Sequence, residues 1–199
     1  MKALLSLCML LLVLPASAAI DTFALNQVRL HSGPFYQAQQ TNIGYLMAMN
    51  PDRLLAPYRR EAGLPPLADP YPNWESSGLD GHIGGHYLSA LALMYSASGE
   101  QKLLDRLNYM INELRSYQQK HGDGYLGGIP GGKATWQQIS QGQIDADLFV
   151  LNKQWVPWYN LHKTFAGLRD AWLLAGREPA KQMLLQYGQY TDEKQHRHL

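Results

Sequence analysis

Apolar residues recur at helical spacing along most of the chain, whereas the alternation typical of β-strands is scarce. The clearest helical stretch runs over about residues 101–121, and another precedes it over about 79–98. Gly99 lies between the two, and glycine commonly ends a helix in the left-handed conformation. The sequence therefore predicts an antiparallel helical hairpin over these residues.

Further helices are predicted on both sides of this hairpin. One covers about residues 26–49 and ends before Pro51, because proline disfavours helix in the residue that precedes it. Another covers about 158–175, with Gly176 as its cap. A last helix begins at Pro179, since proline suits the first helical turn.

Glycine and proline interrupt the helical pattern. Residues 53–73 include five prolines and are expected to form a long irregular loop. Residues 122–132 are rich in glycine and begin with a literal G-x-G-x-x-G, but a predicted helix precedes them, which excludes a dinucleotide fingerprint. Residues 190–199 lose the apolar period and are expected to be an irregular tail.

Helical hairpins joined by long Gly/Pro-rich loops indicate an all-α fold, and we predict a partial (α/α)6 toroid or barrel. At roughly 40 or more residues per helical repeat, a closed ring of six hairpins needs far more chain than this one offers. An incomplete ring leaves apolar helix faces uncovered, so self-association through the incomplete barrel is expected.

The first eighteen residues have the features of a secretory signal. Lys2 supplies a positive start, an apolar run follows to Leu14, and residues 16–18 form an A-x-A cleavage site. The run is too short to span a bilayer. We therefore predict cleavage after Ala18 and a secreted or periplasmic protein.

Removal of this leader leaves 181 residues and takes away Cys8, the only cysteine. It also leaves 16 basic and 16 acidic residues, so the formal net charge is zero. A mature chain without cysteine has no disulfide framework, thiolate metal site or cysteine nucleophile. A neutral balance gives no electrostatic footprint for nucleic acid or an anionic membrane.

The densest candidate site covers residues 74–87. His82 and His86 are four residues apart, so a helix places both imidazoles on one face. Such a pair binds zinc or donates hydrogen bonds to a polyol, and sugar hydroxyls are favoured because no third ligand stands at useful spacing. Glycines at positions 81, 84 and 85 are costly in a helix, which indicates close approach by a ligand or another backbone. The alternative is a capped helix with two satisfied core histidines.

A second cluster covers residues 152–163. Trp155, Trp158 and Tyr159 offer flat apolar faces with polar edges, typical of sites that stack sugar rings. His162 follows Tyr159 by three positions and is its neighbour on a helix surface. The alternative is that these aromatic residues only seal a helix end.

Two strings in these clusters, G-H-x-x-G-H-x-L-S-A at 81–90 and W-Y-x-x-H-K at 158–163, carry a family resemblance. With residues 42–47, 51–55, 74–76, 124–128 and 165–168, they resemble the N-terminal part of the β-L-arabinofuranosidase-like glycoside hydrolases, families 127 and 146 and their relatives. The resemblance covers about residues 22–187, and it implies that residues 19–189 form the N-terminal portion of an (α/α)6 glycoside hydrolase catalytic domain.

The resemblance implies an (α/α)6 barrel, exo-action on L-arabinofuranosides of plant cell-wall glycans, and retention of configuration. It also implies a cysteine nucleophile at a zinc site and a glutamate acid/base, all downstream of the matched stretch. In the family these downstream residues begin with a glutamate in an H-G-G-M-N-E-like string. This chain has no such string and no mature cysteine, so no catalytic residue and no cofactor are assigned, and zinc is expected only in a full-length relative. The predicted substrate-binding residues are His82, His86, His162, Trp74, Trp158, Glu75, Asp80 and Tyr159.

The sequence leaves three functions open. The first is a glycoside hydrolase fragment that binds an arabinose-containing oligosaccharide or polysaccharide and is inactive alone. The second is a stand-alone carbohydrate-binding module that uses the same histidine and aromatic wall. The third is a uronyl hydrolase or lyase of toroid fold acting through Asp80 and His86, which is disfavoured because the clusters hold few cations for an anionic substrate.

Overall fold

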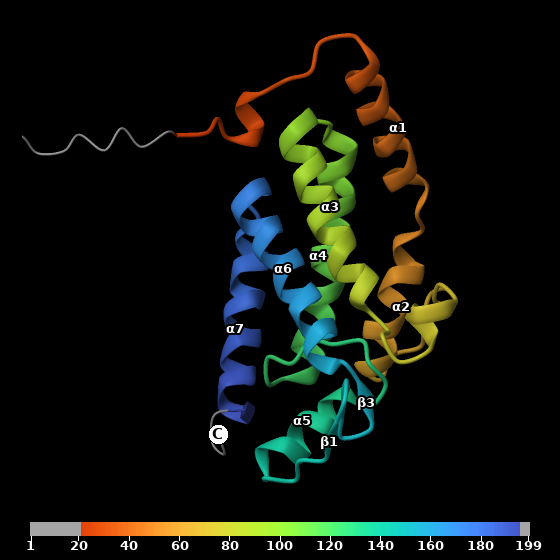
Figure 1. Cartoon of the computed structure of the whole chain (residues 1–199), viewed down its shortest axis with the longest axis vertical. Helices are drawn as coiled ribbons and strands as arrows, with labels where there is room; N and C mark the ends of the chain where they lie inside the picture. Colours follow the sequence, from red (N-terminus) through yellow and green to blue (C-terminus); the bar gives the residue numbers. More distant parts are fainter. Residues whose placement is uncertain (1–20, 196–199) are drawn as a thin grey trace, which may run out of the picture.

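The computed structural model describes residues 21–195, and the predicted leader and residues 196–199 lie outside this range. Figure 1 shows α3, α4, α6 and α7 side by side, with α1 and α2 along one flank and α5 and the strands at one end. No helix in the described range is long and apolar enough to cross a membrane. The elements are η1 Leu25–Gln27, α1 Pro34–Ala48, α2 Pro51–Glu61, η2 Asn73–Ser76, α3 His82–Ser98, α4 Gln101–His121, α5 Gly132–Ser140, β1 Ala146–Asp147, β2 Val150–Leu151, β3 Gln154–Trp155, α6 Pro157–Ala175 and α7 Glu178–Gln195.

The predicted helical hairpin is confirmed as α3 and α4. Gly99 adopts the left-handed conformation at φ 75°, and its amide donates to the Tyr95 carbonyl at 2.7 Å, which ends α3. One face of α4 is fully buried through Leu103, Leu107 and Leu114, each at 0% exposure. The periodic apolar stripe therefore packs α4 against α2, α3 and α7.

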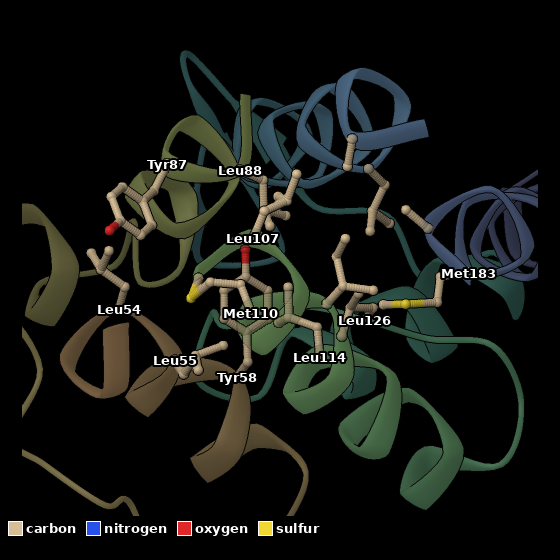
Figure 2. Close-up of a cluster of buried hydrophobic side chains, with 14 of the residues drawn as sticks. Leu54, Leu55, Tyr58, Tyr87, Leu88, Leu107, Met110, Leu114, Leu126 and Met183 are labelled. Atoms are coloured by element: carbon tan, nitrogen blue, oxygen red, sulfur yellow. The ribbon is translucent and has the colours of Figure 1, made fainter. Parts of the chain in front are cut away.

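The core lies between α2, α3 and α4 and extends to α7 (Figure 2). Leu54 and Tyr58 of α2 pack with Leu88 of α3 and with Met110 of α4 in one hydrophobic cluster. The Tyr58 hydroxyl finds polar partners within this core, the Gly81 carbonyl at 2.6 Å and the Thr164 hydroxyl at 2.8 Å. These bonds satisfy a polar group that would otherwise be costly to bury.

Helices α3 and α6 pack at a distance that only glycine allows. A Cβ atom on Gly85 would lie 2.4 Å from the carbonyl carbon and oxygen of Lys163, and one on Gly167 would lie 2.5 Å from the Gly85 carbonyl oxygen. The expectation of a close approach is thus confirmed for Gly85, and the approaching group is another backbone. This contact brings the two sequence clusters, on α3 and α6, into one place.

The predicted irregular loop over residues 53–73 is wrong for its first part, because α2 covers Pro51–Glu61. Pro51 takes the first helical position, and the Asn50 side chain caps the helix by accepting from the Asp52 amide at 2.9 Å. Pro57 lies inside the helix but is buried with Leu54. The free energy gained by burying this apolar face exceeds the cost of the backbone hydrogen bond that the internal proline removes.

Other boundaries also differ from the sequence prediction. The first helix begins at Pro34, and only a short 3-10 turn occupies 25–27. The predicted irregular tail is wrong for residues 190–195, because α7 continues to Gln195. Tyr190 is only 2% exposed and packs against Tyr125 at a ring distance of 5.3 Å, so tertiary burial extends a helix whose polar sequence alone indicates its end. Helix α5 and the antiparallel sheet β1–β2–β3 were not predicted.

Candidate functional site

Glu75 organises the start of α3. The residue is 2% exposed, and its two carboxylate oxygens accept from the amides of Gly81 at 3.0 Å and Ile83 at 2.9 Å. The N-cap residue, Gly81, has φ 94° and no side chain to cap with. Glu75 therefore supplies the cap from outside the helix and places a negative charge at its positive end.

The same carboxylate holds His82. The His82 Nδ1 atom lies 2.6 Å from Oε1 of Glu75 and 2.8 Å from the Leu79 carbonyl oxygen. Both partners are acceptors, so Nδ1 carries a proton and Nε2 is the ring nitrogen left for a ligand. Burial works against protonation, but the hydrogen bond and charge of Glu75 and the Leu79 carbonyl outweigh it and raise the pKa of His82.

Asp80 is held inside the protein in a similar way. Asp80 is 2% exposed, and its carboxylate binds the Arg60 guanidinium at 2.5 Å and the Gly78 amide at 2.9 Å. The sequence prediction grouped Glu75 and Asp80 with residues that contact the ligand. The structure places both beneath the surface with their carboxylates engaged by the protein, which suits positioning and not direct contact.

Asn160 connects the two clusters and was missed in the sequence. Its side-chain amide is 2% exposed and donates to the carbonyls of Leu79 at 2.9 Å and Asp80 at 2.7 Å. Helix α6 therefore holds the loop that precedes α3 through two hydrogen bonds. The available signal was its position, directly after Tyr159 within the second cluster.

His86 and Tyr159 meet across the α3–α6 interface. The Nε2 atom of His86 lies 3.4 Å from the Tyr159 hydroxyl, and the His82 ring lies 6.1 Å from the His86 ring and 6.0 Å from the Tyr159 ring. The shared face predicted for the two histidines is thus observed, with His82 buried and His86 exposed. Partial burial, and then the charge of Lys163, lower the pKa of His86, which favours the neutral form of its ring.

Two tryptophans extend this face. Trp74 is 61% exposed, with its ring 6.3 Å from His82 and 6.4 Å from Trp155. Lys163 places its ammonium group 4.5 Å from the centre of the Tyr159 ring. Together these side chains form a face with aromatic surfaces and imidazole nitrogens, and we call Trp74, His82, His86 and Tyr159 the histidine site.

Trp158 and His162 lie outside this cluster. The Trp158 ring packs edge-on against Trp136 at 5.1 Å and lines a hollow beside the small sheet. His162 is exposed and lines a separate hollow of about 760 Å³ between α6 and α7. Its charge still contributes to the lowered pKa of His86. Both residues lie on α6, as the helix prediction for this segment requires, but their side chains line different hollows.

The backbone before α6 is strained. Val156, the N-cap residue, has φ 39°, a conformation that is rare for a β-branched side chain and costs roughly 1–3 kcal/mol. Its amide donates to the Phe149 carbonyl at 2.8 Å, which ties the turn to the sheet. Trp155 precedes this turn and its ring contacts Trp74, whereas Trp158 follows it and its ring contacts Trp136.

The zinc that the family resemblance implies does not fit the described residues. Only His82 and His86 share a face, and Nδ1 of His82 is already held by two protein acceptors. Over residues 21–195, no group of three or more His, Cys, Asp or Glu side chains could hold a metal ion. The site can instead offer imidazole and phenol hydrogen bonds beside flat aromatic faces, which is the chemistry that recognises sugar hydroxyls and ring faces.

Comparison with known families agrees with this geometry. The model of the β-L-arabinofuranosidase GH127 catalytic domain matches residues 27–198 of the chain, whereas comparison with curated proteins gives no match. The matched range includes α1 to α7, and the all-α architecture agrees with part of an α/α toroid. The chain therefore belongs to the β-L-arabinofuranosidase family of glycoside hydrolases with a GH127 catalytic domain.

Proposed function

We propose that this chain binds L-arabinofuranosyl groups of plant cell-wall glycans at the histidine site. The observation that carries the proposal is the meeting of His86 and Tyr159 at 3.4 Å across two helices, with His82 directly beside both rings. In this assignment Nε2 of His82 and His86 and the Tyr159 hydroxyl contact sugar hydroxyls, and Trp74 covers an apolar ring face.

The remaining predicted residues take supporting roles in this proposal. Glu75 positions His82 and the first turn of α3, and Asp80 fixes the preceding loop through Arg60. Trp158 and His162 contact more distant parts of a glycan in this proposal, because Trp158 lines a hollow that also includes Tyr159, and His162 is near enough to His86 to influence its pKa. None of these residues is assigned a catalytic role.

We further propose that the 199-residue chain by itself binds without hydrolysing. The family resemblance implies a cysteine nucleophile, and the only cysteine here is Cys8, in the predicted leader. Glycoside hydrolysis otherwise uses two carboxylates that flank the scissile bond, and the carboxylates of Glu75 and Asp80 are buried and engaged. Zinc chemistry is expected only in a longer relative.

Secretion and self-association complete the proposal. The leader over residues 1–18 directs the chain to a secreted or periplasmic location, where the protein has access to plant glycans. Phe35 at 78% and Tyr45 at 64% exposure on α1 leave apolar surface that would support self-association.

The test is a titration of the chain from residue 19 with methyl β-L-arabinofuranoside, followed by NMR of the histidine side chains. We expect saturable binding that perturbs His82 and His86, and no turnover of an aryl β-L-arabinofuranoside with zinc present. The absence of saturable binding by a cooperatively folded chain would reject the function. Tighter binding of a galacturonide than of the arabinoside would favour the uronyl hydrolase or lyase, and zinc-dependent turnover would reject the binding-only assignment.

A further inference from the structure

The glycine-rich stretch that follows α4 is used by none of the functions proposed above, and it shapes a hollow against α7. Gly124 has φ 88°, and a Cβ atom on it would lie 2.5 Å from the Gln186 carbonyl oxygen, so only glycine lets the loop approach α7 this closely. The hollow has a volume of about 500 Å³, which is in the range of small-ligand sites, and its lining comes from α4, this loop and α7. It shares no lining residue with the histidine site.

Buried polar atoms without a partner gather at this corner of the molecule. Within residues 21–195, the buried side-chain atoms that lack a hydrogen bond are Oε1 of Gln118, Nε2 of His121 and the Tyr190 hydroxyl. Gln118 lies one helical turn before His121, and the Tyr125 ring is 4.9 Å from the His121 ring and 5.3 Å from the Tyr190 ring. Gln118 and Tyr190 also line the hollow. Since buried polar groups are nearly always paired, this clustering indicates a partner that is not part of the chain.

The Gln118 side chain defines what this partner must offer. Its Nε2 atom donates to the carbonyl oxygens of Gly124 at 2.9 Å and Met183 at 3.0 Å, so a reversed amide would place its oxygen against two acceptors. Oε1 is therefore the atom without a partner, and it requires a hydrogen-bond donor. Gln118 and Tyr190 are each 2% exposed, and an unpaired polar group at that depth destabilises the folded protein. A ligand in the hollow that donates hydrogen bonds would remove this cost.

The other lining side chains select the class of ligand. The exposed ones carry amides or carboxylates: Gln119, Asp123, Gln186, Gln189 and Glu193. None of the lining residues, all of which lie in the described range, is Lys or Arg, so an anion finds no cation there. Lys133 pairs with Asp123 at 2.9 Å, which weakens the attraction for an organic cation. A sugar hydroxyl both donates and accepts, so it can pair with amides and carboxylates alike, whereas an ammonium group only donates.

We propose that this hollow is a second sugar-binding site, separate from the histidine site, which holds one neutral sugar residue of a glycan through its hydroxyl groups. The juxtaposition that carries it is the two buried unpaired groups of Gln118 and Tyr190 beside exposed amides on α7. The choice of an arabinose-containing glycan as the ligand rests on the function proposed above. A glycan long enough to reach both sites would bind more tightly than at either one alone.

The test is an NMR titration of the chain from residue 19 with L-arabinotriose, followed through the side-chain amides of Gln118 and Gln186. We expect saturable shifts of these amides, independent of those at the histidine site. Tyr190→Phe should weaken this binding about fivefold, as for loss of one hydrogen bond, and leave the affinity of the histidine site unchanged. It should not lower the stability of the sugar-free chain, because the Tyr190 hydroxyl has no hydrogen-bond partner within residues 21–195. Tyr187→Phe is the matched control, because Tyr187 is 1% exposed on the same helix and does not line the hollow.

Gln186→Ala is a second variant that removes an exposed lining amide, and it should weaken the same binding about threefold, with the exposed Gln182→Ala on α7 as its control. No shift of the Gln118 and Gln186 amides, or shifts that neither variant weakens, would overturn the second site. A sugar-free Tyr190→Phe chain that is less stable than the wild type would show that water already pairs the hydroxyl, which also overturns it. Shifts with choline but none with arabinotriose would reject a sugar as the ligand. Absence of shifts at the histidine site alone would reject the function proposed above and not this second site.

Discussion

Helix α1 and the α3–α6 pair both contain interior glycines, but only the glycines of the pair are in close contact with another backbone. Both contain interior glycine and exposed aromatic residues, but an added Cβ on Gly44 of α1 meets nothing within 4 Å, whereas one on Gly85 meets the Lys163 backbone at 2.4 Å. In α1 the glycine only weakens the helix. In α3 the weakening is offset by close backbone packing, and that packing brings the histidine site together.

The largest effect is expected from Gly85→Ala. The added methyl group would force α3 and α6 apart, because backbone atoms of Lys163 and Thr164 lie within 2.7 Å of its position. We expect a loss of about 3 kcal/mol in the free energy of unfolding and loss of arabinoside binding, measured by urea unfolding and calorimetry. A loss below about 0.5 kcal/mol would show that the two helices separate easily.

Glu75→Gln tests the polar support beneath the same interface. Glutamine has one acceptor oxygen where Glu75 engages two amides and His82, so a buried donor loses its partner. We expect a cost of roughly 1–3 kcal/mol in the free energy of unfolding, together with weaker arabinoside binding. Asp69→Asn, a carboxyl change on the nearby loop, is the control.

The pH dependence of this pair has a defined sign. Because the pKa of His82 is raised on folding, the charged pair stabilises the protein fully below the unfolded value of about 6.5 and loses that effect as the pH rises through the folded pKa. The difference in unfolding free energy between wild type and Glu75→Gln should therefore shrink from about pH 5.5 to 8.5. A difference that does not vary with pH would contradict a charged His82–Glu75 pair.

His86→Ala separates binding from stability at the interface. The side chain is exposed, so its loss should change the free energy of unfolding by less than about 0.5 kcal/mol. We expect arabinoside affinity to fall about tenfold, as for loss of one hydrogen bond of about 1.4 kcal/mol. His31→Ala, an exposed histidine before α1, is the control and should bind as the wild type does.

The smallest effect, with the opposite sign, is expected from Gly44→Ala. Nothing lies within 4 Å of the new methyl group, and alanine favours a helix over glycine by roughly 0.5–1 kcal/mol. Thermal unfolding should show a small stabilisation. A destabilisation would mean that α1 has a close neighbour at Gly44, and the contrast with Gly85 would then disappear.

Local signals were sufficient for several elements. Residues 101–121 were predicted and observed as α4, because an apolar stripe and flanking glycines are properties of the segment itself. The sequence failed at α2, where its prolines indicate a loop, and at the last turns of α7, where its polar residues indicate a tail. In both places burial against distant residues outweighs the local preference.

The sequence by itself determined the all-α class, the family and the spacing that places His82 and His86 on one helical face. Only the tertiary structure decided that His82 is buried against Glu75, that His86 contacts Tyr159, and that Trp158 and His162 line separate hollows. Spacing defines which residues share a helix face, because the helix repeat is a local property. What each face contacts depends on the packing of segments more than 70 residues apart, such as His86 and Tyr159.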